Sequence, residues 1–369
     1  NHPMIRALAP EYDLEAWRKR IPLLASRSLI PMNNCSQAPQ TDLTRAAADG
    51  YLESWNTSGM DWDAWIGEVQ LARGVFAKLV NASADEIAVF SSVSEATSSV
   101  ASALDFSGRR RKVVVTEAEF PTIGHVWLAQ ERRGARVAWV PEHGGTVELA
   151  AYDALLDDET AIVSAGHGYY LNGFTQDLAQ VASLVHAQGA LLYVDAYQTL
   201  GAVPVDVKAL DVDFLASGNL KFLMGVPGVA FLYVRRELAE RLEPTVTGWL
   251  GRANPFEFGT KELSWSASAS RFDTGTPPVM NAYIARAGME IITGLGVGNI
   301  RDWHEVLARR LIEGGRSRGL TLFGTDDVSR KTATTAFVVR DSHAVESAMR
   351  ARGVLPSARG PVIRLAPHF

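Results

Sequence analysis

Short apolar runs alternate with amphipathic segments along residues 85–234, and this alternation limits the chain to a small set of folds. Each run is too continuously apolar for a half-solvated strand and is typical of a strand buried on both faces of a parallel sheet. Segment 177–187, between two of these runs, carries apolar residues at helical spacing, and Gly189 is placed to end it. Strands that alternate with such helices form βαβ units, so we predict an α/β fold with a mainly parallel sheet. The predicted strands are residues 87–90, 113–115, 135–140, 161–163, 191–194, 213–216 and 229–234.

An acid and an amine follow two successive strands of this predicted sheet. Asp195 stands where one run ends, and Lys221 follows the next run in a Ser/Gly-rich turn. Because ligands bind outside the carboxyl ends of strands in open α/β sheets, we expect both side chains at the same edge. Pyridoxal 5′-phosphate (PLP) needs a lysine for its Schiff base and an aspartate that keeps its pyridine nitrogen protonated. The pair therefore indicates a PLP site, and the alternative is an ordinary α/β domain with a solvated lysine.

The sequence around this pair resembles the class V aminotransferase family of fold-type I PLP-dependent enzymes. The motif is Val-Asp-Ala-x-Gln at residues 194–198, then Ser-Gly-x-x-Lys at 217–221 and Gly-x-x-Gly-x-x-Phe-Leu at 225–232. The family includes cysteine desulfurases, kynureninases and isopenicillin-epimerase-like proteins. The resemblance implies a large domain with a mainly parallel seven-stranded sheet and a smaller C-terminal α+β domain.

The sequence pattern changes after Arg235, which agrees with this two-domain expectation. Helical segments are predicted near 279–293 and 302–316, and short strands near 320–323, 336–339 and 362–365. We predict a large PLP-binding domain of residues 31–254. Residues 1–30, as an N-terminal arm, and residues 255–369 form the predicted small domain.

Residues for the cofactor phosphate follow from the resemblance. The segment after the strand 87–90 is Ser-rich and opens a helix, whose N-terminus favours anions but by itself mostly indicates a cap. In the family this loop holds the phosphate, which implies that role for Ser94, Glu95 and Ala96. Ser217 is implied as a hydroxyl donor to the same group. Thr276 lies in a Gly-Thr-Pro turn whose threonine reaches the phosphate of the neighbouring subunit, so the resemblance implies a homodimer.

The cofactor ring is expected between Phe120 and Ala196. Glu-Phe-Pro-Thr at 119–122 resembles a family segment whose aromatic residue stacks on the ring, although Phe120 alone would suit a core position. Gln198 matches the glutamine that hydrogen-bonds the cofactor's phenolic oxygen. Lys221 is implied as the Schiff-base lysine and general base, and Asp195 as the partner of the pyridine nitrogen.

Arg364 is the implied substrate residue, in the C-terminal pattern Ile-Arg-x-x-Pro-His-Phe. An arginine forms a bidentate fork with an α-carboxylate that lysine cannot copy, whereas the structural alternative is a strand-edge ion pair. Trp249 lies in a Gly-Trp-Leu-Gly segment similar to one in kynureninases near the cofactor, or serves as a packing anchor. Leu220 departs from the histidine or tyrosine that often precedes the lysine in this family. Cys35 lies near the N-terminus, where no persulfide role is expected.

Aromatic residues near the N-terminal end of the chain are candidates for the side-chain pocket of the substrate. Residues 56–62 have the composition of an exposed loop, which would suit a substrate gate or a dimer contact. The candidates are Trp55, Trp62, Trp65 and Trp249.

The implied activity is that of a PLP-dependent enzyme acting on a modified L-amino acid through an external aldimine and a Cα carbanion. Lyase-like side-chain cleavage or deamination is the preferred interpretation, because the matching motifs are those of desulfurases, lyases and kynureninases. The alternatives are an aminotransferase with a keto-acid acceptor and a non-catalytic PLP-fold protein. A nicotinamide enzyme is disfavoured because Asn299 replaces the last glycine of a GxGxxG pattern; a helix C-cap followed by an Asn N-cap explains that segment better.

Composition argues against nucleic-acid and membrane partners, while the resemblance implies a small-molecule amino-acid substrate. The net charge of −5 and the pI near 6.0 give no basic surface for nucleic acid. No apolar run reaches the roughly 18 residues of a membrane helix. The eight histidines are scattered, which argues against a metal site. With a single cysteine no intrachain disulfide can form, and we expect a cytoplasmic protein.

Overall fold

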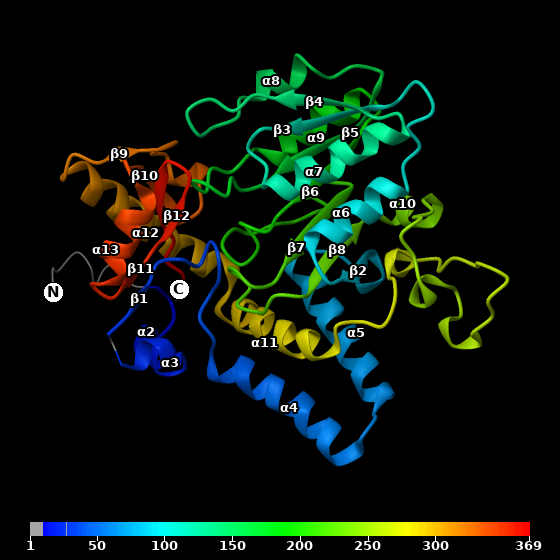
Figure 1. Ribbon diagram of the computed structural model, residues 1–369, viewed down its shortest axis with the longest axis horizontal. Helices are drawn as coiled ribbons and strands as arrows, with labels where there is room; N and C mark the ends of the chain where they lie inside the picture. Colours follow the sequence, from blue (N-terminus) through cyan, green and yellow to red (C-terminus); the bar gives the residue numbers. More distant parts are fainter. Residues whose placement is uncertain (1–9, 27) are drawn as a thin grey trace.

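A seven-stranded sheet forms the centre of the computed structural model, which describes residues 10–26 and 28–369 (Figure 1). The strand order is β2-β8-β7-β6-β5-β3-β4. Strands β4, β3, β5, β6 and β7 run parallel, and β8 is antiparallel to both β7 and β2. The predicted mainly parallel seven-stranded sheet is confirmed. Its strands are β2 (Ile87–Phe90), β3 (Lys112–Thr116), β4 (Arg136–Val140), β5 (Thr160–Gly166), β6 (Leu191–Asp195), β7 (Phe214–Gly218) and β8 (Ala230–Val234).

Both faces of this sheet are buried, which explains the continuous apolar runs in the sequence. Successive side chains of a strand point to opposite faces. In β6, Leu192 and Val194 join one core cluster, while Tyr193 between them joins the other. Helices α5, α9 and α11 contribute to the first cluster, and α6 and α7 to the second. Strands buried in this way cannot slip in register without moving every side chain to the wrong face.

The helices cover the sheet and continue into the smaller part of the molecule. Asp177 caps α9 through the backbone amide of Gln180, and Gly189 follows with a φ of 70°, as predicted. The α-helices are α2 (Leu14–Lys19), α3 (Pro22–Ala25), α4 (Asp42–Ser58), α5 (Trp62–Leu79), α6 (Val93–Ser102), α7 (Pro121–Ala129), α8 (Leu149–Asp153), α9 (Leu178–Ala187), α10 (Arg236–Arg241), α11 (Val279–Leu295), α12 (Val297–Arg316) and α13 (Ser342–Arg350). Single 3₁₀ turns lie at Ala84–Glu86, Gln130–Arg133, Trp249–Gly251, Pro255–Glu257, Ala269–Phe272 and Val328–Arg330.

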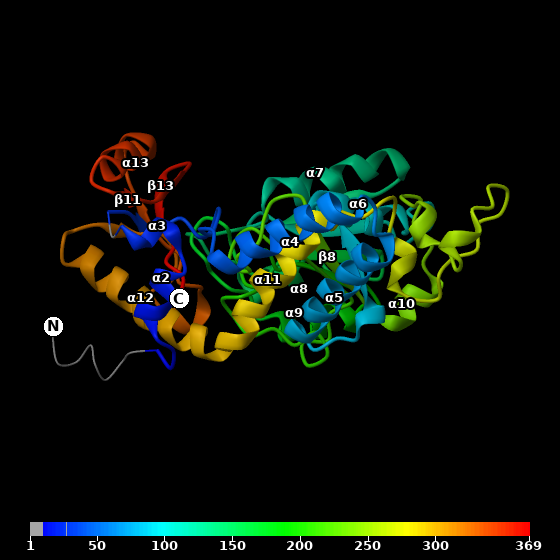
Figure 2. The same ribbon diagram turned by 90° about the horizontal axis from the view of Figure 1, so that it is seen from below.

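A four-stranded antiparallel sheet forms the second part of the fold, beside the large sheet in Figures 1 and 2. Its order is β12 (Ser357–Arg359), β13 (Val362–Leu365), β10 (Thr335–Val338) and β9 (Thr321–Leu322). Strand β1 (Ile30–Pro31) pairs in parallel with β11 (Val354–Leu355), which joins the N-terminal arm to this region. The small α+β region anticipated from the sequence is therefore present.

Helix α11 belongs with the large sheet by its packing, although it falls within the predicted small-domain range 255–369. It packs against α4 and α5, and its Val279, Ala282, Ala285 and Met289 lie in the main core cluster. The domain boundary at residue 254 stays a prediction.

Two local predictions were wrong. Residues 56–58 continue helix α4, which ends at Ser58, and Gly59 with a φ of 69° starts a short turn before α5. Gly296, rather than Asn299, caps helix α12, and Asn299 lies inside that helix and donates to Leu295 O at 2.9 Å. In both places a short polar side chain donates to a carbonyl one turn back, as Thr57 does to Glu53 O at 2.8 Å, so it is accommodated inside the helix. Within the described residues no helix is long and apolar enough to span a membrane.

Candidate active site

Asp195 and Lys221 lie in one cavity of about 380 Å³ at the carboxyl ends of β6 and β7. Asp195 is the last residue of β6, and Lys221 follows the end of β7 by three residues. The two strands are parallel neighbours, with Asp195 opposite Ala216. The predicted convergence of acid and amine at one sheet edge is thus present in the structure.

The Lys221 amine lies among aromatic rings and carboxylate charge. Its Nζ lies 4.3 Å from the Tyr197 ring centroid and 5.6 Å from that of Phe120. Burial lowers the pKa of Lys221 to about 8, against the opposing effect of the Asp195 carboxylate. An amine with this pKa is neutral often enough near pH 7 to act as a nucleophile or base.

Two acids stand at the other side of the cavity. Asp195 Oδ1 accepts a hydrogen bond from the Tyr197 amide at 2.9 Å, while burial raises the pKa of Asp195. Glu119 is also buried, and burial together with the Asp195 charge raises its pKa well above the usual range. Its Oε2 has no hydrogen-bond partner among the described residues. Burial therefore disfavours the charged form of both acids, and the Asp195 charge adds to this effect at Glu119.

The N-terminus of α6 opens onto the same cavity. Ser92 is its N-cap and accepts from the Glu95 amide at 3.1 Å. Ser91, Ser92, Val93 and Ser94 line the cavity. Of the predicted phosphate residues, Ser94 lies in the cavity, whereas Glu95 and Ala96 lie behind it in the first turn of the helix. Free backbone amides at such a terminus attract a phosphate.

The predicted ring-binding residues lie close together. Phe120 lines the cavity, is 43% exposed and meets Tyr170 edge to face at 5.3 Å. Gln198 also lines it and donates to Cys35 O at 3.1 Å. Ala196 is fully buried beneath the site, and the neighbouring Tyr197 lines the cavity instead.

Arg364 enters the cavity from the small sheet. It lies in β13, is 1% exposed and donates to Tyr170 O at 2.8 Å, to Ser36 Oγ at 3.1 Å and to Ser357 Oγ at 2.5 Å. These acceptors are neutral, and Arg364 Nε has no partner among the described residues. Burial lowers the pKa of Arg364. A buried guanidinium without a carboxylate is prepared to bind an anion from outside the chain.

Besides Glu95, Ala96 and Ala196, three further predicted residues do not line this cavity. Ser217 is buried and donates to Gly218 O at 2.7 Å. Thr276 is exposed and lines a neighbouring cavity of about 220 Å³, which shares Ser91 with the first. Trp249 packs against the rings of Phe256 and Phe258. The roles predicted for these residues stay predictions.

The tryptophans of α4 and α5 also lie elsewhere. Trp65 is buried and donates to Ser54 Oγ at 2.9 Å, while Trp55 and Trp62 are exposed at the ends of these helices. None of the three lines the cavity that holds Lys221. The structure therefore gives no support to a substrate gate formed by this segment of the same chain.

Several cavity residues were missed by the sequence analysis. Cys35, Tyr170, Tyr197 and Arg359 line the cavity together with Lys221. Tyr197 lies inside the recognised motif, so its position offered a usable signal. The others come from loops and strands remote in sequence, and no local pattern marks them.

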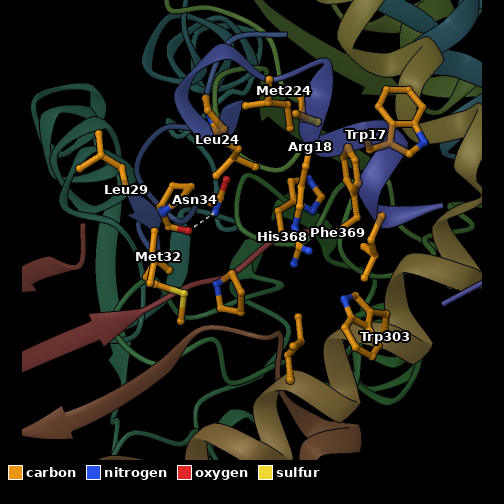
Figure 3. Close-up of a pocket in the computed structure, with 17 residues that line it drawn as sticks. Trp17, Arg18, Leu24, Leu29, Met32, Asn34, Met224, Trp303, His368 and Phe369 are labelled. Atoms are coloured by element: carbon orange, nitrogen blue, oxygen red, sulfur yellow. Dashed lines mark hydrogen bonds between the residues drawn. The ribbon is translucent and has the colours of Figure 1, made fainter. Parts of the chain in front are cut away.

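A second cavity, of about 420 Å³, lies between the N-terminal helices, the start of α12 and the C-terminal residues (Figure 3). Apolar side chains such as Trp17, Leu24 and Trp303 dominate its lining, with Arg18 and His368 as charged or titratable groups. None of the predicted site residues lines it, so the smaller cavity is the candidate active site. In the described part of the chain, no cluster of three His, Cys, Asp or Glu side chains could hold a metal ion.

Comparisons with known proteins agree with this assignment. The family model described as aminotransferase class V matches residues 46–358. The uncharacterised aminotransferase YcbU of Bacillus subtilis is 36% identical over 361 residues, which cover 97% of this chain and 94% of that protein. Kynureninase of Pseudomonas fluorescens is 26% identical over 378 residues, covering 97% of this chain and 88% of the enzyme.

Solved structures show the same fold. An apo cysteine desulfurase from Thermococcus onnurineus NA1 superposes with a TM-score of 0.87 at 22% identity, covering 98% of this chain and 94% of that one. Another neighbour, a lysine-to-alanine mutant of C-DES, has a TM-score of 0.86 at 18% identity and holds glycine covalently linked to its PLP cofactor; the match covers 95% of this chain and 94% of that one. At these identities the likeness shows the fold, which is that of fold-type I PLP enzymes.

Proposed function

Since the chain belongs to the class V aminotransferase family of PLP-dependent enzymes, we propose that it cleaves the side chain of, or deaminates, a modified L-amino acid in the cavity around Lys221. The observation that carries this proposal is the convergence of Lys221, Asp195 and Arg364 on one cavity from two sheets. These three groups supply an amine, an acid and a carboxylate receptor.

The residues present fit PLP. The cavity offers a helix N-terminus with serine hydroxyls, the Asp195 carboxyl group, and an amine that forms no ion pair with the described residues. Two buried polar atoms, Arg364 Nε and Glu119 Oε2, have no hydrogen-bond partner among the residues that the structure describes. Ser94 and the α6 amides would hold the phosphate, Phe120 would lie against the ring, and Asp195 would face its nitrogen. The bound cofactor supplies an electron sink that stabilises negative charge at the substrate Cα.

Each protein group then has a defined task. Arg364 donates two parallel hydrogen bonds to the α-carboxylate and so fixes the orientation of the Cα–H bond. Lys221 Nζ, neutral in part because burial lowers its pKa to about 8, takes the proton from Cα. Asp195, whose carboxylate accepts a hydrogen bond from the Tyr197 amide, would hold a proton at the pyridine nitrogen. Phe120 and Tyr170 limit water at the reacting face.

An aminotransferase reaction is the second candidate, favoured by the 36% identical relative named as an aminotransferase. Kynureninase among the relatives favours side-chain cleavage. The two reactions differ in one requirement, because an aminotransferase needs a keto-acid acceptor for turnover and a lyase does not.

The test is a visible absorption titration of the protein reconstituted with PLP, using a panel of L-amino acids and Lys221→Ala as the control. We expect a yellow species that borohydride fixes onto the wild-type chain and not onto Lys221→Ala. Continuous product release without a keto acid selects the lyase. Turnover only with a keto acid selects the aminotransferase, and no absorbing species with any PLP concentration overturns the proposal.

We also propose a homodimer in which Thr276 of one chain serves the cofactor of the other. Thr276 is exposed, lies outside its own chain's cavity, and is close to Ser91 at the phosphate side. The segment between α10 and α11 extends away from the sheet in Figure 2 and exposes Phe256 and Phe258, at 63% and 66%. Exposed aromatic clusters of this kind are typical of protein interfaces.

Subunit mixing tests this arrangement. Lys221→Ala chains lack the amine, and Thr276→Val chains lack the hydroxyl. In a mixed dimer, the chain that retains Lys221 receives an intact Thr276 from its partner, so we expect tight PLP binding to return to one site. Weak binding after mixing would show that Thr276 serves its own chain, and tight binding by Thr276→Val chains alone would show that Thr276 does not serve the cofactor.

A further inference from the structure

Arg359 lies on the same face of the small sheet as Arg364. Strand residues two apart share a face, and directly opposed residues of antiparallel strands also share one. Ser357 and Arg359 are two apart in β12, and Ser357 lies opposite Arg364 of β13. Ala358 between them packs with Ile363 in the core of the small region. The opposite face, with both arginines, therefore looks into the cavity that holds Lys221.

The two arginines have no counter-ion in this cavity. Arg364 donates to neutral oxygens, as described above. The Arg359 guanidinium makes no hydrogen bond or ion pair with the described residues. Glu346, the nearby acid that acts on the charge of Arg364, is engaged by Arg350 at 3.7 Å and accepts from the Ala358 amide. If Arg364 binds the α-carboxylate of the substrate, Arg359 still has no partner among the described residues.

Positive charge is in excess at this end of the cavity. Arg364 and Arg359 both oppose the protonation of Lys221, and Arg359 also opposes the charge on Arg364. The acids Asp195 and Glu119 line the same cavity, and burial raises the pKa of both, which reduces the negative charge that they offer. A ligand with a single negative charge, already bound by Arg364, would leave this excess uncompensated. A second negative charge on the ligand would balance the positive charge of Arg359.

We propose that the substrate is an L-amino acid with an acidic side chain, whose side-chain anion binds Arg359 while its α-carboxylate binds Arg364. This inference rests on the proposed function, since it assigns the substrate class of the same cavity. Arg359 is exposed at the edge strand β12, so it selects the incoming amino acid at the mouth of the cavity, whereas buried Arg364 orients it. The preference holds for either reaction outcome, because both begin with binding of the same amino acid.

The experiment compares L-aspartate and L-glutamate with their uncharged isosteres L-asparagine and L-glutamine. Binding to the PLP-loaded enzyme is followed by the change in visible absorption. We expect the acids to bind more tightly than the amides in the wild type. In Arg359→Gln the acids should lose roughly 10-fold to 100-fold in affinity, as expected for a charge-assisted hydrogen bond, while the amides keep theirs. Arg359→Lys should retain part of the preference.

Two further measurements separate this inference from the proposed function. The apoprotein, without cofactor, is titrated calorimetrically with glutarate, which has two carboxylates and no amine; we expect binding that Arg359→Gln weakens. PLP affinity is measured for the same variant and should be unchanged. Equal affinity of acids and amides in the wild type overturns the inference, and so does weakened PLP binding in Arg359→Gln, because the arginine would then serve the cofactor phosphate. Failure of any amino acid to perturb bound PLP would instead overturn the proposed function.

Discussion

The basicity of Lys221 gives the sharpest prediction from this structure. Burial lowers its pKa from 10.5 to about 8. At pH 7 an amine with a pKa of about 8 is neutral in roughly one molecule in ten, whereas a pKa of 10.5 leaves roughly one in 3,000 neutral. The neutral amine is the nucleophile, so Lys221 should react with the PLP aldehyde about 300 times faster at pH 7 than an exposed lysine of equal intrinsic reactivity.

The assay mixes apoprotein with PLP at a series of pH values, quenches with borohydride and locates the reduced adduct by peptide mass spectrometry. The initial rate should rise with pH, bend near pH 8 and then level off. Lys221→Ala should form no reduced PLP adduct at the initial rate of the wild type. A rate that keeps rising toward pH 10, or a fast adduct on another lysine, would refute the reasoning.

Lys331 provides the matched control. Burial lowers its pKa to about 7, below that of Lys221, but it is 2% exposed and donates to Thr332 O and Thr334 O. It does not line the cavity. If low pKa alone governed the labelling, Lys331 would be modified first, so an unmodified Lys331 shows that access through the cavity decides.

Three further predictions follow from the same geometry. Lys221→Met should stabilise the apoprotein by about 1–3 kcal/mol at pH 7, because burial in the folded protein disfavours the protonated amine. The gain in unfolding free energy, measured with urea, should be full at pH below 8 and should disappear as the pH rises toward 10.5. Arg364→Lys keeps the charge but loses the fork, so steady-state kinetics should show KM raised by about 10-fold or more while PLP absorption stays unchanged. Phe76→Ala, which removes a fully buried ring stacked at 4.9 Å on Phe231, should cost about 3–5 kcal/mol in denaturant unfolding without changing the pH profile of Lys221.

The sequence predicted the large sheet well because its information there is local. Each strand is a continuous apolar run, and the strand order brings Asp195 and Ser217 to the same edge through neighbouring parallel strands. Lys221 then follows Ser217 by only four residues. Because this pattern does not depend on contacts between distant segments, the sequence was sufficient to predict that the acid and the amine lie at the same sheet edge.

The remaining cavity residues depend on contacts between distant segments. Cys35, from the N-terminal segment, is held at the cavity by the hydrogen bond that its carbonyl accepts from the Gln198 side chain. Arg359 reaches the cavity because β12 pairs with β13. Neither residue lies in a motif that marks chemistry. The error over residues 56–58 has a local cause, since Thr57 donates to Glu53 O inside helix α4 and does not start a turn. The predicted homodimer and cytoplasmic location stay predictions.

The site depends on how the small sheet is held against the loop that carries Lys221. The Leu220 carbonyl accepts from the Ala38 amide at 2.9 Å, and the carbonyl of Phe222, on the other side of the lysine, lies 2.8 Å from His368 Nε2. The lysine is therefore held on both sides by backbone contacts to segments at opposite ends of the chain. Leu220 contributes its backbone carbonyl here, so the loss of the family's polar side chain at this position leaves the anchoring of the loop intact. Because Arg364 and His368 lie on the same C-terminal segment, the segment that places Arg364 in the cavity also holds the loop that carries Lys221.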